Sequence, residues 1–153
     1  MSYILKQVTI RTDNSEKGIS EISGLWKDIS EGKIPLLFDS EKNSQKDISP
    51  VSKYSNYSSD ENGKYDLSVI TVTADFFKEL DKAVERKEYI KYIEKDENGD
   101  ISICAQNAWK RVWEDQKSGK IDRKFTEDYE STVPKDYTND GMAHCYLYIA
   151  IKQ

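Results

Sequence analysis

The residues best suited to chemistry in this chain are carboxylates that lie close to aromatic side chains. If residues 125–130 form a strand, alternation places Phe125 and Tyr129 on one face and Asp128 and Glu130 on the other. With Phe125 and Tyr129 toward the helices, Glu130 projects from the opposite side of the sheet. Aromatic rings and a carboxylate suit an organic cation, because they add cation–π and Coulomb attraction. The alternative is that tyrosine is simply a good strand former and that Glu130 is solvated.

Patterns for other chemistry are weaker or absent from the sequence. His144 directly precedes Cys145, but neighbours on a strand point to opposite faces and cannot form a hydrogen-bonded pair there. The chain has no C-x-x-C, H-x-x-x-H or calcium-loop spacing, no phosphate loop and no G-x-G-x-x-G motif. The sequence therefore predicts no metal and no cofactor, and it favours a binding protein over an enzyme.

Length, composition and charge limit the class of protein. The chain has 153 residues, a length typical of one domain, and we expect residues 1–153 to form one. It has two cysteines, and it shows neither a secretion signal nor an apolar run long enough for a membrane span. We therefore expect a soluble cytoplasmic protein that does not bind membranes. The net charge of −5 argues against direct nucleic-acid binding.

Hydrophobic periodicity and turn residues predict the same order of elements twice. The first repeat, about residues 3–74, has a strand at 3–11, a helix at 16–31, a long polar loop at 33–52, and strands at 51–57 and 64–73 joined by a hairpin at Asn62-Gly63. A helix at 74–87 connects it to the second repeat, about residues 88–152. That repeat has a strand at 88–95, a helix at 101–116, and strands at 125–131 and 143–152.

The two long helices also share local sequence. Residues 25–29 read LWKDI and residues 108–112 read AWKRV. Within the same order of elements, this match favours a duplication. The predicted fold class is α+β: a duplicated β-α-β-β repeat that forms an antiparallel sheet with both helices packed on it.

The order of motifs resembles the gyrase-inhibitor-like effector-binding superfamily, which includes the ligand domains of some AraC- and MerR-type regulators and stand-alone, integron-associated sensors. The matching segments are residues 19–26, 57–66, 108–113, 128–130 (DYE) and 145–152 (CYLYIAIK). The resemblance implies a ligand cleft between the repeats. In many relatives the cleft binds lipophilic, often cationic, aromatic compounds, and a glutamate at the position of Glu130 is the key acidic contact.

Three hypotheses of function follow. The first is a stand-alone small-molecule-binding protein, linked to transcription regulation or to a xenobiotic response, which would act alone, through a partner or beside a separately encoded regulator. Its candidate ligand-binding residues are Glu130, Trp109, Tyr148, Tyr65, Tyr57 and Trp26. All five aromatic candidates, Tyr148 included, could instead belong to the core. The second hypothesis is a hydrolase of reactive small molecules that uses Glu130, and the third is an interaction module that binds DNA gyrase, as some relatives do.

Overall fold

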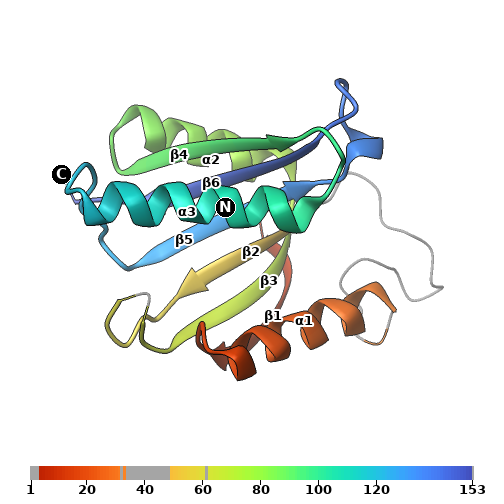
Figure 1. Cartoon of the computed structure of the whole chain (residues 1–153), viewed down its shortest axis with the longest axis horizontal. Coiled ribbons are helices and arrows are strands. Elements are labelled where there is room, and N and C mark those ends of the chain that lie inside the picture. The colour runs from red at the N-terminus through yellow and green to blue at the C-terminus, as the bar shows by residue number, and fades with distance from the viewer. Residues whose placement is uncertain (1–3, 32, 34–48, 61, 153) are drawn as a thin grey trace. The chain divides into compact units, whose positions relative to one another are not determined.

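The computed structural model describes residues 4–31, 33, 49–60 and 62–152, which fall into two compact units (Figure 1). The first unit runs to Glu79 and includes residues 125–127, and the second holds residues 80–124 and those from Asp128 onward. The elements are β1 (Ile4–Thr12), α1 (Glu16–Ser30), β2 (Ser49–Ser55), β3 (Tyr65–Val72), α2 (Ala74–Glu85), β4 (Tyr89–Asp96), α3 (Ile101–Lys117), β5 (Glu127–Val133), a short 3-10 helix (Lys135–Tyr137) and β6 (Ala143–Ala150).

In the first unit, β3 lies between β1 and β2 and pairs with both in the antiparallel direction. Leu67 of β3 is opposite Ile10 of β1 and Tyr54 of β2, so these three side chains share a face. Leu25 and Ile29 of α1 are buried against this face. The apolar stripe of the helix and the alternation along β3 thus build one hydrophobic core.

The start of α1 is fixed by its local sequence. The hydroxyl of Ser15 accepts a hydrogen bond from the backbone N–H of Gly18 at 3.1 Å, which satisfies one free donor of the first turn. A Cβ at Gly18 would lie 2.0 Å from the carbonyl oxygen of Asp13, so this position requires glycine. Ser15 is therefore the N-cap of α1.

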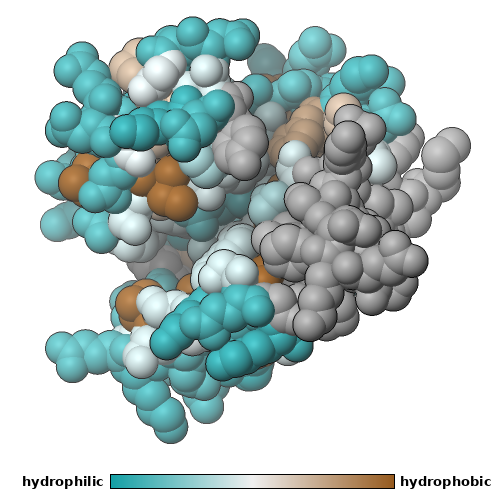
Figure 2. All heavy atoms as spheres, turned by 90° about the vertical axis from the view of Figure 1, so that its right-hand side faces the viewer, coloured by the Kyte–Doolittle hydropathy of each residue, from teal (hydrophilic) through white to brown (hydrophobic). Residues whose placement is uncertain are grey.

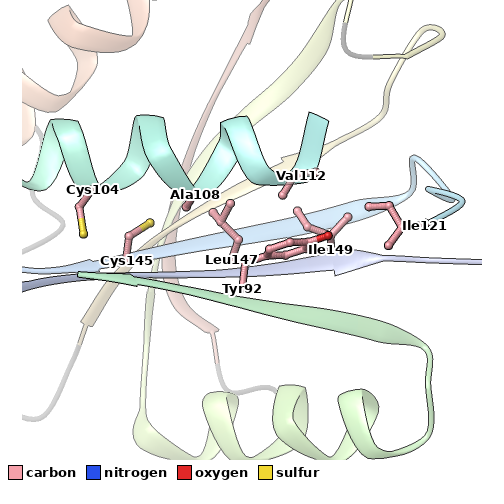
Figure 3. Close-up of a cluster of buried hydrophobic side chains, with 8 residues drawn as sticks. All are labelled: Tyr92, Cys104, Ala108, Val112, Ile121, Cys145, Leu147 and Ile149. Carbon is pink, nitrogen blue, oxygen red and sulfur yellow. The ribbon is translucent and has the colours of Figure 1, made fainter. Parts of the chain in front are cut away.

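In the second unit, β6 takes the central place between β4 and β5, again antiparallel to both. Leu147 of β6 is opposite Tyr92 of β4 and Glu130 of β5. Figure 3 shows α3 lying along this face of the strands, with Cys104 and Val112 directed toward them. The eight buried residues of this core are Tyr92, Cys104, Ala108, Val112, Ile121, Cys145, Leu147 and Ile149.

The two units repeat one β-α-β-β order, in which the last strand is the central one. The matched helix segments play matched roles, since Leu25 and Ile29 are buried in α1 as Ala108 and Val112 are in α3. The prediction of an α+β fold with a duplicated repeat and antiparallel strands is confirmed. The predicted cleft between the repeats stays a prediction.

One local prediction is confirmed and another is wrong. The strands β2 and β3 are antiparallel neighbours, and Gly63 lies in the turn between them, where its N–H bonds to the carbonyl of Asp60 at 3.1 Å. Phe125 has a φ of 55° and precedes β5, so it does not alternate with Tyr129 along a strand. The predicted loop at 33–52 lies mostly outside the described residues, and its last residues belong to β2.

Within the described ranges, none of the helices has both the length and the apolar character needed to cross a membrane. Among the described residues on the face that Figure 2 shows, most are hydrophilic, and the hydrophobic ones appear as small separate areas.

Candidate functional site

Glu130 lies on β5 and faces α3, because it is opposite Leu147 in the register of β5 and β6. The prediction that Glu130 projects from the side away from the helices is therefore wrong, since it shares its face with the core residue Leu147. Its side chain is half-buried, and its Oε1 lies 4.0 Å from the Sγ of Cys145. Burial, and then the negative charge of Glu130, raise the pKa of the Cys145 thiol. Glu130 is thus a carboxylate at the edge of an apolar core.

Asp128, two residues before Glu130 on the same face, has a structural role. Its carboxylate pairs with Arg123 at 2.9 Å, and the two side chains are 0% and 2% exposed. It also accepts a hydrogen bond from the backbone N–H of Ala150 at 2.8 Å. These contacts hold the segment before β5 against the end of β6, so the two acids of the DYE motif differ in environment.

Trp109 projects from α3 and packs, half-buried, against the core on the same side of the strands as Glu130. Its ring centroid lies 6.2 Å from that of Trp113 and 5.8 Å from the guanidinium carbon of Arg123. Trp113 is 43% exposed. One side of α3 therefore carries the neighbouring indole rings of Trp109 and Trp113, and the guanidinium of Arg123 lies against the ring of Trp109.

Tyr148 lies on the other face of the same strands, because it is opposite Tyr129 rather than Glu130. Its ring is 2% exposed, and its hydroxyl donates a hydrogen bond to Asp81 of α2 at 3.0 Å. The ammonium of Lys91 lies 5.2 Å from the ring centroid. Burial is the main cause that raises the pKa of Tyr148. The structure does not bring Tyr148 together with Glu130 on one face.

The remaining candidates belong to the first unit, where Tyr57 and Tyr65 are neighbours. Their ring centroids are 5.9 Å apart, and the ring of Phe125 lies 5.6 Å from Tyr57. Tyr65 is 2% exposed and donates a hydrogen bond to Asn14 at 2.7 Å. Trp26 is half-buried and packs against the same core. Tyr57 and Trp26 retain exposed surface, whereas Tyr65 is a core residue.

Tyr54 was missed by the sequence analysis. Its ring centroid lies 5.5 Å from that of Tyr65, and it belongs to the same cluster as Tyr57. The signal was present in the strand pattern, because Tyr54 lies two residues after Ser52 and so shares its face of β2, opposite Leu67. Tyr54, Tyr57, Tyr65 and Phe125 form a group of four rings, which we call the tyrosine cluster.

The structure also separates His144 from Cys145. Cys145 is buried under α3, whereas His144 lies on the opposite face of β6 with Tyr146 and Tyr148. This confirms the expectation from strand alternation. Over the ranges that the structure describes, no group of three or more histidine, cysteine, aspartate or glutamate side chains is arranged to hold a metal ion.

Comparison with known proteins identifies the fold. No protein-family model matches the chain, and no curated protein matches it in sequence. An integron cassette protein from the mobile metagenome of Vibrio cholerae superposes with a TM-score of 0.61 at 18% identity, covering 97% of this chain and 93% of that one. SAV2435, solved bound to tetraphenylphosphonium, superposes with a TM-score of 0.54 at 14% identity, covering 99% of this chain and 94% of its own. The chain thus has a fold that occurs in a small-molecule-binding protein.

Proposed function

We propose that this protein binds lipophilic aromatic cations and that Glu130 is the acidic contact for the ligand. The observation that carries the proposal is a half-buried carboxylate on the α3 side of β5, in a fold whose structural neighbour SAV2435 binds tetraphenylphosphonium. Transcription regulation or a xenobiotic response are the roles that such binding would serve, as the resemblance to effector-binding domains implies.

The environment of Glu130 suits a cation that carries its own apolar surface. A half-buried carboxylate is less well screened than one in open water, so its attraction for a cation is stronger there. A small hydrated cation keeps its water shell and gains little from such a site. A cation surrounded by phenyl rings gains apolar burial as well as Coulomb attraction.

The aromatic candidates take different parts in this proposal. Trp109, Tyr57 and Trp26 are half-buried and offer ring surface to a ligand. Each cation–π contact contributes about 0.5–2 kcal/mol. Tyr65 and Tyr148 are almost fully buried, so we assign them the role of holding the neighbouring side chains in place.

Fluorescence titration with tetraphenylphosphonium tests the proposal, with the tryptophans as the signal. We expect saturable quenching in the wild type and an affinity about tenfold lower in Glu130→Gln, which corresponds to roughly 1.4 kcal/mol. The matched control is Glu114→Gln, which removes an exposed carboxylate from the outer side of α3 and should leave the affinity unchanged. The neutral analogue triphenylphosphine oxide should bind wild type and Glu130→Gln equally.

Equal affinity of tetraphenylphosphonium for wild type and Glu130→Gln would contradict the role of Glu130. Analysis of the ligand after incubation separates binding from catalysis. Recovery of unchanged ligand is the expected result. A hydrolysis product that disappears in Glu130→Gln would replace the binding proposal with the hydrolase hypothesis.

A further inference from the structure

Three side chains form a continuous hydrogen-bonded chain on the face of β6 that is turned away from α3. Nδ1 of His144 lies 2.9 Å from the hydroxyl oxygen of Tyr146, two residues along the same strand. Nε2 of His144 lies 2.9 Å from both carboxylate oxygens of Asp140. The order is therefore hydroxyl, imidazole, carboxylate, and all three groups belong to the second unit.

The ionised carboxylate of Asp140 sets which group donates in each of the two hydrogen bonds. Its carboxylate accepts from the backbone N–H of Met142 at 3.0 Å and pairs with Lys95 at 3.1 Å, and these contacts, with His144, hold its pKa well below the usual range. An ionised carboxylate only accepts, so Nε2 of His144 carries the proton toward Asp140. In the neutral imidazole Nδ1 is then an acceptor, and the hydroxyl of Tyr146 donates to it.

A nucleophile hydrogen-bonded to a base, with the base oriented by a third group, is the arrangement of covalent hydrolases. We propose that Tyr146 is a nucleophile that His144 activates as general base and Asp140 positions, and that this second site accepts acyl groups from activated carboxylic esters. The proposal does not involve Glu130, which lies on the other face of the strands.

The reaction balances in two steps. The Tyr146 oxygen attacks the ester carbonyl while its proton passes to Nδ1 of His144, and a C–O bond forms. The bond from the carbonyl to the leaving alcohol breaks, and the alcohol oxygen takes the proton from His144. Water, deprotonated by His144, then hydrolyses the acyl-tyrosine to the free acid and restores the hydroxyl of Tyr146.

The site is reachable and lies near a positive charge. The side chain of His144 is 13% exposed and that of Asp140 is 30% exposed, while Tyr146 is half-buried. The ammonium of Lys91 lies 5.4 Å from the centroid of the Tyr146 ring and pairs with the carboxylate of Asp81 at 3.1 Å.

Acid-quenched mass spectrometry after brief reaction with p-nitrophenyl acetate tests the proposal, and absorbance follows the released p-nitrophenolate. We expect one acetyl group on Tyr146 and none there in Tyr146→Phe. His144→Gln should slow labelling of Tyr146 about a hundredfold, because general-base assistance contributes roughly that much or more. The matched control is Tyr92→Phe. It removes a hydroxyl that donates a hydrogen bond to Asp115 and not to a histidine, so acetylation of Tyr146 in this variant should match the wild type.

The positioning role of Asp140 has its own measurement. The groups around His144 are Asp140, Tyr146 and, opposite it on β4, Lys95. The carboxylate fixes the tautomer in which Nε2 carries the proton, so Asp140→Asn should slow labelling of Tyr146, and Asp140→Glu, which keeps a carboxylate acceptor, should restore part of the rate. Labelling of Tyr146 at the same rate in His144→Gln or Asp140→Asn would overturn the proposal, as would acetylation of lysines alone. With two such variants, the test does not depend on the folding of either one.

Discussion

Tyr54 and Glu130 each lie opposite a buried leucine of the central strand of their own unit. Tyr54 is opposite Leu67 on the central strand β3, and Glu130 is opposite Leu147 on the central strand β6. Both side chains therefore face the long helix of their own unit. In the first unit this position carries a ring of the tyrosine cluster, and in the second it carries a carboxylate. The two repeats therefore share the fold here and differ in charge.

The tyrosine cluster gives a prediction that separates packing from ligand binding. Tyr65→Phe keeps the ring but removes the hydroxyl that donates to Asn14 at 2.7 Å. We expect the free energy of unfolding, measured in urea, to fall by about 1 kcal/mol, the usual contribution of such a hydrogen bond. Tyr65→Ala should cost about 3–5 kcal/mol, because it empties a buried site. A loss of tetraphenylphosphonium affinity in Tyr65→Phe without any loss of stability would identify Tyr65 as a ligand contact instead.

Hydrophobic periodicity was enough to predict the elements of this fold. The stripe of α1 and the alternation of β6 each depend on residues that recur at the period of their own element, so the buried faces could be recognised without the structure. The duplicated order of elements could be recognised because Trp26 and Trp109 lie in matching segments of two helices. In each segment the structure buries the residue before the tryptophan.

The candidate site was harder to predict, because it depends on register and on residues outside the strands. Phe125 adopts a left-handed backbone just before β5, which ends the alternation that the sequence pattern suggested. Asp128 and Glu130 share a face, but only the tertiary structure pairs the first with Arg123 and leaves the second half-exposed. No local pattern marks which of two neighbouring acids will find a buried cation.

The two cysteines should be unreactive in the folded protein. Cys104 and Cys145 are buried, and burial is the main cause that raises the pKa of each thiol. We expect a disulfide reagent to modify neither thiol at a pH of about 8 in native buffer and both in urea. Reaction of native Cys145 at the rate of an unfolded thiol would contradict this.

The same thiols should make stability depend on pH in the alkaline range. A thiol whose pKa is higher in the folded than in the unfolded state stabilises the protein at pH values below its unfolded pKa, here 9.0. This contribution is lost as the pH rises above that pKa. We therefore expect the free energy of unfolding to fall between pH values of about 8 and 10. The variant with both Cys104→Ala and Cys145→Ala should show a smaller fall over the same interval.

The N-cap of α3 gives a local test of the second unit. The carboxylate of Asp100 accepts hydrogen bonds from the backbone N–H groups of Ser102 at 2.9 Å and Ile103 at 3.2 Å. Asp100→Ala should lower the free energy of unfolding by about 1 kcal/mol, as measured by thermal or urea denaturation. Asp100→Asn keeps an acceptor at the same place and should retain most of this stability. Equal losses in both variants would mean that charge, rather than capping, matters here.

The largest predicted loss of stability concerns the buried pair of Arg123 and Asp128. Asp128→Asn removes the negative charge but leaves the guanidinium buried, so we expect the free energy of unfolding in urea to fall by about 3–5 kcal/mol. The control is the pair of Lys152 and Asp122, 3.8 Å apart with side chains 61% and 74% exposed. Asp122→Asn should cost at most about 1 kcal/mol, because water already solvates both charges.

A loss below about 1 kcal/mol in Asp128→Asn would show that the buried guanidinium finds another partner, contrary to this prediction. The fluorescence of Trp109 provides an independent measurement, since the guanidinium of Arg123 lies against its ring. If Asp128 holds Arg123 in place, Asp128→Asn should change the tryptophan emission of the folded protein and Asp122→Asn should not. Tetraphenylphosphonium affinity should fall in the same variant, because Trp109 would no longer be held where we propose that it meets the ligand.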